Sequence, residues 1–441
     1  MAAMIGLAVT LILFPLAGWS LGRRSIGEAF LFGAGLTGSV LFLAGVVHVP
    51  LVIALALIGA WSVGCGVWEL RRRRRGMPSD HPLPTPYSPL PTILTCIPFI
   101  ALTFAAAITP LNDFDGRAFW VLKAKEIARE RAIDGPSFKA VTLDPRKNHY
   151  PILIPLDGAV ILGIAHDFDD RQLRWFYLGV LAALALLVRE RIGRLVSPSA
   201  GAWCAALLVW IPQFSVEAEG GALSAYNDLA IAAFAAGAFF ELAEEVAKSA
   251  APKRRDFGAI RFGLWLAFLI LTKSEGLPFA IVFLAVGAFV FRKRITSSAI
   301  VAGIAAVALF VWRTRIPPGD EEDIIRLLPT IPQKLHNVRA ALAAFPRHML
   351  LMPHWGLFWI AVIIAAVLAL RNDRRNATLA ISVIAAMLAV YVLVYVATAW
   401  VVSDLIAVTA DRLLMHVIAP SLFLLAMAAR RFRSLNPESV D

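Results

Sequence analysis

Apolar runs separated by short polar intervals make up most of the chain. The runs recur at about the length that a helix needs to cross roughly 30 Å of hydrocarbon. The pattern therefore predicts an all-α polytopic membrane protein of roughly 12–14 membrane segments. The predicted spans are Met4–Trp19, Glu28–Val47, Leu51–Trp68, Thr92–Thr109, Pro151–Ala165, Leu173–Val188, Ala200–Ile211, Leu229–Leu242, Phe262–Leu271, Leu277–Phe291, Ala299–Trp312, Trp355–Leu370, Ala377–Ala397 and Leu413–Ala429.

The longest polar interval, Leu111–Pro155, begins with two carboxylates, Asp113 and Asp115. A candidate helix comes next, with most charges on one face and an apolar sector on the other, formed by Trp120, Val121, Ala124, Ile127 and Ala128. Such a helix is expected to rest on the membrane surface with its aromatic face in the lipid boundary. Asp115 fits two roles at this point, a catalytic carboxylate or the N-cap of the helix that starts at Gly116.

The composition agrees with a membrane protein, because 59% of the residues are hydrophobic and 17% are charged. Soluble domains average about 45–50% apolar and about 25% charged residues. The net charge of +11 comes from short basic clusters between the apolar runs. That placement indicates cytoplasmic loops and argues against nucleic-acid binding. The cysteines, Cys65, Cys96 and Cys204, have no metal-ligand spacing and are interpreted as packing residues.

The basic clusters and a proline-rich stretch suggest how the chain is organised. The unbroken run Arg71–Arg75 is expected in the cytoplasm, and the proline-rich linker after it suggests that the first spans are an appendage to the rest of the chain. The predicted regions are N-terminal membrane spans (1–70), a basic, proline-rich cytoplasmic linker (71–91), a membrane core (92–312) including the outer loop 111–150, an outer loop with a surface helix (313–352), and C-terminal spans with a basic tail (353–441).

One loop conflicts with the predicted sidedness. If Leu111–Tyr150 and Pro212–Asp228 both lie outside, the cationic loop Arg189–Arg194 cannot be inside after two full crossings. Either Pro151–Ala165 dips into the membrane and returns, or the loop is an exception to the charge rule.

Several polar residues near span ends have both a structural and a functional interpretation. Asp228 is a fair N-cap or a functional acid, and Lys273 and Glu275 either pair with each other or serve a site. The histidines, including His149, His336, His348 and His354, show no ligand spacing. A divalent metal is possible because the outer loops carry hard oxygen ligands, although solvated acids are the alternative: Asp113, Asp115, Glu217, Glu219 and Asp228.

Four motifs follow one another along the chain. They are the sequence from Asp115 to Lys125, His149-Tyr150-Pro151 through Pro155, Tyr226-Asn227-Asp228-Leu229-Ala230, and Leu271-Thr272-Lys273-Ser274-Glu275-Gly276. Taken together they resemble motifs of bacterial GT-C glycosyltransferases. Asp411-Arg412-Leu413-Leu414 is a weaker match. Those enzymes are multi-pass proteins that use polyprenyl-phosphate sugars, like the aminoarabinose, rhizobial galacturonosyl and protein mannosyl transferases. The likeness covers roughly Thr92 to Gly276; Phe114 and Gly116 depart from the usual Trp-Asp-Ala.

The resemblance implies a GT-C-like helical bundle with juxtamembrane helices on the outer face. It implies Asp115 as general base and Asp228 as a supporting acid, with no cofactor required. Residues expected to bind substrate or organise the site are Lys123, His149, Tyr150, Lys273, Glu275, Arg339, Arg347 and Arg412. The expected partners are a polyprenyl-phosphate sugar donor, a lipid, glycan or protein acceptor, and membrane lipids. The expected location is the outer face of a bacterial plasma membrane.

The chemistry fits these residue types, because transfer from a lipid phosphate needs a base for the acceptor hydroxyl and cations for the leaving phosphate. The segment Arg313–Met352 is a second candidate surface helix, with Leu335, Val338, Leu342 and Phe345 at helical spacing. Its arginines either bind the donor phosphate or contact anionic lipid heads. The alternatives to a transferase are a transporter or flippase of lipid-linked sugar and a non-catalytic assembly partner.

Overall fold

The computed structural model describes residues 5–19, 25–75, 89–140, 148–165, 168–215, 219–248, 257–317 and 328–434. Within these ranges every regular element is a helix. In chain order they are α1 (Ile5–Gly18), α2 (Ile26–Val46), α3 (Leu51–Arg74), α4 (Pro89–Ile108), η2 (Gly116–Val121), α5 (Leu122–Glu130), α6 (Pro136–Lys139), α7 (Leu153–Ala165), α8 (Arg171–Leu195), α9 (Pro198–Trp210), α10 (Pro212–Ser215), α11 (Asp228–Lys248), α12 (Gly258–Thr272), α13 (Gly276–Phe291), η3 (Arg292–Arg294), α14 (Ile295–Arg313), η4 (Leu328–Asn337), α16 (Val338–Met349), α17 (Met352–Trp355), α18 (Phe358–Asn372), α19 (Arg374–Ala397), α20 (Val402–Leu414), η5 (Met415–Val417) and α21 (Ile418–Ser434).

Helix length and exposed apolar side chains define the class of protein. Among the described residues, 6 stretches are long and apolar enough to cross a membrane, and shorter apolar helices accompany them. Large apolar side chains such as Phe289, Phe310 and Ile100 are exposed on the outside of the bundle. A soluble protein buries such residues, whereas a bilayer covers them. The chain is therefore an all-α polytopic membrane protein, as its hydrophobic pattern predicts.

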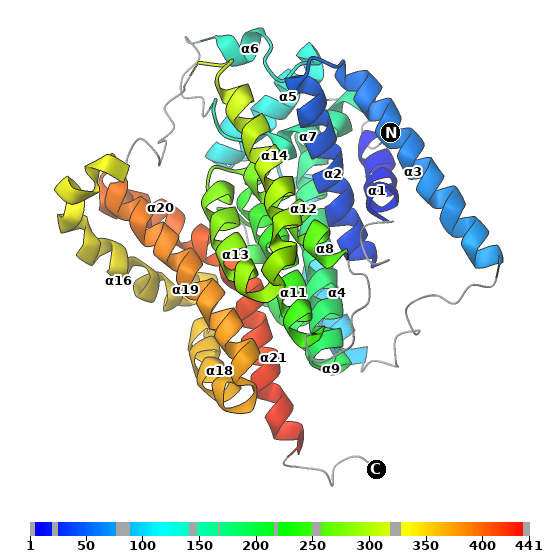
Figure 1. Ribbon diagram of the computed structural model, residues 1–441. Helices are drawn as coiled ribbons and strands as arrows, with labels where there is room; N and C mark the ends of the chain where they lie inside the picture. Colours follow the sequence, from blue (N-terminus) through cyan, green and yellow to red (C-terminus); the bar gives the residue numbers. More distant parts are fainter. Residues whose placement is uncertain are drawn as a thin grey trace.

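The core is built around α11, which lies in the middle of the bundle in Figure 1 and is buried along almost its whole length. The N-terminal helices belong to the same core. Phe14 of α1 contacts Phe30 of α2 edge-to-face at 5.8 Å, and Phe32 packs on Trp265 of α12 at 4.2 Å. The expectation that the first spans are an appendage is therefore wrong for α1 and α2. The proline-rich part of the linker, 76–88, lies outside the described residues.

A buried ion-pair network marks one end of the bundle, called here the network end. Arg191 of α8 donates to Glu28 of α2 at 2.7 Å and to Glu241 of α11 at 2.8 Å. Arg261, near the start of α12, donates to Glu241 at 3.1 Å. Asp228 is the first residue of α11, whereas Glu241 lies thirteen residues further along, about 20 Å at 1.5 Å per residue. The network and Asp228 therefore lie toward opposite ends of the helix. The end that carries Asp228 is called the site end.

The half-length helix α7 resolves the conflict in predicted sidedness. Before α7, the ring of His149 contacts the carbonyl of Ile316 at 3.0 Å, just beyond the site end of α14. After α7, Arg174 of α8 donates to the carbonyl of Leu223 at 3.0 Å, also at the site end. Both flanks of α7 are therefore on one side, so Pro151–Ala165 dips into the bundle and returns. Helix α8 then carries Arg191 to the network end, where it is buried in ion pairs.

The two expected surface helices differ from each other. The apolar face of η2 and α5 is covered by protein, mainly α7, with Val121, Ala124 and Ile127 each 1% exposed. The expectation that this face lies in the lipid boundary is therefore wrong. In α16, Phe345 is buried against Tyr395, with ring centroids 5.8 Å apart, while Leu342 is exposed. Amphipathic spacing alone does not distinguish a protein neighbour from lipid.

Candidate functional site

Three segments distant in sequence meet around Arg412 of α20. Arg412 Nη1 lies 3.0 Å from Asp115 Oδ2, at the start of η2. Its guanidinium lies 4.9 Å from the ring centre of Tyr226, in the loop before α11. The main-chain N–H of Asp115 donates to the Tyr226 hydroxyl at 3.2 Å. Arg412, which belongs to the Asp411-Arg412-Leu413-Leu414 match, therefore contacts both the motif that begins at Asp115 and the motif that begins at Tyr226.

Asp115 occupies the N-cap position of η2 but does not act as a cap. Its side chain makes no capping hydrogen bond. The carboxylate instead pairs with Arg412 and remains 33% exposed, whereas the Arg412 side chain is 10% exposed. Of the two interpretations of Asp115, the structure therefore removes the cap and leaves a partly open carboxylate beside a buried guanidinium.

Asp228 is enclosed, in contrast to Asp115. Its side chain is fully buried, and Oδ1 lies 2.9 Å from Nζ of Lys273. The same Nζ lies 3.0 Å from Glu275 Oε1. Lys273 therefore pairs with Glu275, the structural role considered for these two residues from the sequence, and it also pairs with Asp228. Asp228 is closed off from solvent in this arrangement, so its direct effect is on Lys273 and the charges around it.

His416, which lies in η5 between α20 and α21, was not anticipated from the sequence. Its Nε2 is 3.4 Å from Asp228 Oδ1, and its Nδ1 is hydrogen-bonded to the Tyr391 hydroxyl. Arg412 and His416 are four residues apart, a spacing that puts both side chains on one helical face. That spacing was a usable signal, because the two residues contact the two predicted acids. His416 is otherwise buried among aromatic rings, including Phe279.

Asp411 links this centre to the segment before α18. Its carboxylate contacts the His348 ring at 2.7 Å and accepts a hydrogen bond from the Trp355 indole at 3.0 Å. His348 belongs to α16, so the second expected surface helix does contact the site region. The expected phosphate ligands Arg339 and Arg347 are exposed on the same helix. Their role stays a prediction.

The His149-Tyr150 motif forms a neighbouring group with Lys123. The buried ammonium of Lys123 donates to the Tyr150 carbonyl at 3.4 Å, and the Tyr150 ring stacks on Trp120 at 5.7 Å. Arg313 of α14, which the sequence motifs did not include, donates to the His149 carbonyl at 2.8 Å and to Ser274 at 3.4 Å. This arginine therefore ties the motif to the Lys273–Glu275 turn.

The acids do not gather as metal ligands. Among the described residues, no group of three His, Cys, Asp or Glu side chains could hold a metal ion. Asp115 and Asp228 are matched with Arg412 and Lys273 instead. Burial raises the pKa of the Glu219 carboxyl, and the Arg412 charge opposes that shift. Glu217, the remaining hard ligand from the sequence, lies outside the described residues.

Gly116 allows η2 to approach the loop before α11. A Cβ at this position would lie 2.0 Å from the main-chain oxygen of Ser224. The adjacent Ala225 has a left-handed backbone, with φ 56°. Because a non-glycine residue in that region is strained, the close contact constrains the loop that carries Tyr226 and Asp228. The departure of Gly116 from the resembled motif therefore has a packing reason in this chain.

We expect Gly116→Ala to lower the free energy of unfolding by roughly 1–3 kcal/mol, because main-chain atoms must shift to admit the methyl group. Thermal unfolding of the purified protein measures this change. Gly59→Ala is the matched control, because nothing lies within 4 Å of its added Cβ. Equal unfolding temperatures for the two variants would contradict the close approach.

Comparison of the chain with protein-family models, with curated proteins and with solved structures gave no match. The functional proposal therefore rests on the motifs and on the contacts around Arg412.

Proposed function

We propose that the chain is a GT-C-type glycosyltransferase that moves a sugar from a polyprenyl-phosphate donor to an acceptor hydroxyl. The observation that carries the proposal is the partly exposed Asp115 paired with the buried Arg412 at the end of a membrane bundle. The pair combines the two groups that this transfer needs, a carboxylate base and a cation for the leaving phosphate. A donor whose lipid tail stays in the bilayer would place its sugar phosphate beside the Asp115–Arg412 pair.

In the proposed reaction the acceptor oxygen attacks the anomeric carbon in line with the phosphate. The bond between that carbon and the phosphate oxygen breaks, and the lipid phosphate leaves with the electron pair. Asp115 takes the proton from the acceptor hydroxyl. A single displacement of this kind inverts the anomeric configuration. No metal is needed, because Arg412 neutralises charge on the departing phosphate.

Arg412 has to serve both carboxylate and phosphate in this scheme. Asp115 is paired with Arg412 in the structure, so the carboxylate has to leave this partner before it can accept a proton from the acceptor hydroxyl. We propose that the donor phosphate draws Arg412 away from Asp115 and so frees the base. The stacked Tyr226 ring supports the guanidinium during this exchange. Lys273, held by Asp228 and Glu275, contributes a second positive charge close by.

The proposed location is the outer face of a bacterial plasma membrane. Two features support this orientation: the basic cluster Arg292–Arg294, in which Arg294 pairs with Glu245 of α11, lies at the network end, and the loops with Asp113, Asp115 and Glu219 lie at the site end. The positive-inside rule puts the network end in the cytoplasm. The acceptor is a lipid, glycan or protein that is accessible from the outer face.

Transfer assays with purified protein in liposomes test the proposal directly. A labelled sugar on a polyprenyl phosphate is expected to pass to an acceptor extracted from the cell envelope, with loss of label from the donor. Counterflow of the labelled lipid across the liposome membrane without a transfer product would instead establish a flippase. The half-length helix α7 is the observation that favours this second candidate, because transporters often bind their substrates at interrupted helices.

The exposed arginines of α16 are expected to act on donor binding rather than on the chemical step. We expect Arg339→Ala or Arg347→Ala to raise the apparent donor KM more than it lowers kcat, because a phosphate ligand contributes to binding. Steady-state kinetics over a range of donor concentrations measures both constants. Arg371→Ala is the control, because it removes an exposed cation near the C-terminal end of a different helix, α18. An unchanged donor KM in both α16 variants would remove this helix from the site.

A further inference from the structure

Asp157 is a fully buried carboxylate in the middle of α7. Neither of its two oxygens has a hydrogen-bond partner among the described residues. Helix α7 belongs to the segment Pro151–Ala165, which enters the bundle and returns without crossing it. An ionisable side chain inside a membrane protein is expensive, and such residues commonly mark a pathway for an ion or a proton.

The ionisable groups on the elements packed around α7 are engaged elsewhere. Helix α1 has none, while Glu28 of α2 and Arg261 of α12 belong to the network end. The charged residues of η2, α5 and the start of α8 are Arg117, Lys123, Lys125, Glu126, Arg129, Glu130, Arg171 and Arg174. Lys125 pairs with Asp170, and Arg174 binds main-chain carbonyls. No cation among the described residues is paired with Asp157.

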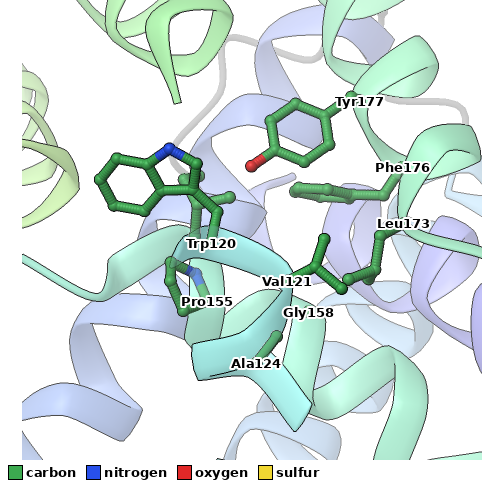
Figure 2. Close-up of a pocket in the computed structure, with 9 residues that line it drawn as sticks. Trp120, Val121, Ala124, Pro155, Gly158, Leu173, Phe176 and Tyr177 are labelled. Carbon is green, nitrogen blue, oxygen red and sulfur yellow. The ribbon is translucent and has the colours of Figure 1, made fainter. Parts of the chain in front are cut away.

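Tyr177 of α8 is an ionisable group that lies within electrostatic range of Asp157. Its phenol lies within electrostatic range of both Asp157 and Asp228, and its hydroxyl donates to Asn227 at 2.7 Å. Figure 2 shows this hydroxyl directed into a small cavity, facing Trp120. The cavity is about 10 Å³ and is lined also by Pro155 and Gly158, which precede and follow Asp157 on α7; Asp157 itself does not line it. That volume is close to the minimum for one water molecule.

We propose that Asp157 is a proton-binding site inside the bundle. An ionised carboxylate without a partner is strongly disfavoured in such surroundings, whereas the neutral acid is tolerated. The proton comes from water; one O–H bond forms on the Asp157 carboxyl and one breaks on the hydronium ion. Release is the reverse step. The proposal does not depend on sugar transfer, because it rests on burial and the lack of a counter-ion.

Infrared spectroscopy of the full-length protein in liposomes tests the site. The carbonyl band of a protonated carboxyl group is expected at neutral pH, shifted by deuterium and absent from Asp157→Asn. The matched control is Asp404→Asn, which removes an exposed acid of α20 and should leave the band in place. A spectrum of Asp157→Asn that keeps the whole band would show that Asp157 is ionised and would overturn the proposal.

A second measurement covers the case in which Asp157→Asn does not fold. Dicyclohexylcarbodiimide adds to protonated carboxyl groups in apolar surroundings, so mass mapping of the treated wild-type protein is expected to find the adduct on Asp157. Asp228, whose charge is matched by Lys273, is the internal control and should stay unlabelled. Labelling of Asp228 without Asp157 would also overturn the proposal.

Discussion

Replacing Asp115 with asparagine is expected to lower kcat for sugar transfer by about 10²- to 10⁴-fold, the usual contribution of a positioned base. The amide cannot accept the proton of the acceptor hydroxyl. The donor KM should change little, because the substitution leaves Arg412 in place to bind phosphate. Single-turnover transfer with saturating donor measures the chemical step, and thermal unfolding checks that the variant is folded.

Asp404→Asn is the control for this experiment, because it removes an exposed carboxylate from α20, the helix that carries Arg412. It should transfer at the wild-type rate. A folded Asp115→Asn protein with wild-type kcat would exclude the base assignment. A variant with normal kcat and a much higher donor KM would assign Asp115 to orienting Arg412 instead.

The predicted spans agree with the helices because hydrophobic length is set directly by the bilayer. The meeting of Asp115, Tyr226 and Arg412 could be anticipated only as a resemblance between motifs, since no local pattern reports a contact across 297 positions. The structure supplies that contact through α20, a helix that the hydrophobic pattern did not mark. Its amphipathic sequence, interrupted by Asp404, Asp411 and Arg412, hides it from a search for apolar runs.

Other features had weaker signals in the sequence. The charge rule exposed the problem at Arg189–Arg194, and the alternative in which Pro151–Ala165 returns proved right. The charge rule did not indicate that Arg191 would be buried with Glu28 and Glu241, because those partners come from helices that are distant in the sequence. Asp157 was equally hidden, since an isolated acid in an apolar run could face a partner. Its unpartnered state became visible only when the surrounding helices were in place.

Variants of the buried pair Lys273 and Asp228 distinguish a structural role of the pair from a role in sugar transfer. Lys273→Met is expected to lower the free energy of unfolding by roughly 3–5 kcal/mol, because it leaves a buried carboxylate without its cation. Lys248→Met is the control: its contact with Glu245 is 4.0 Å long and partly exposed, so its loss should cost less than about 1 kcal/mol. Thermal and denaturant unfolding in detergent compare the two variants.

The double variant Lys273→Met/Asp228→Leu is expected to regain most of the lost stability, because it replaces both charges with apolar groups. Sugar transfer should be lost in the double variant, since the positive charge near the donor phosphate and the acid that holds it are both absent. A double variant as stable as the wild type that also transfers sugar normally would limit this pair to a packing role. The centre of the chemistry would then be confined to Asp115 and Arg412, which the double substitution does not touch.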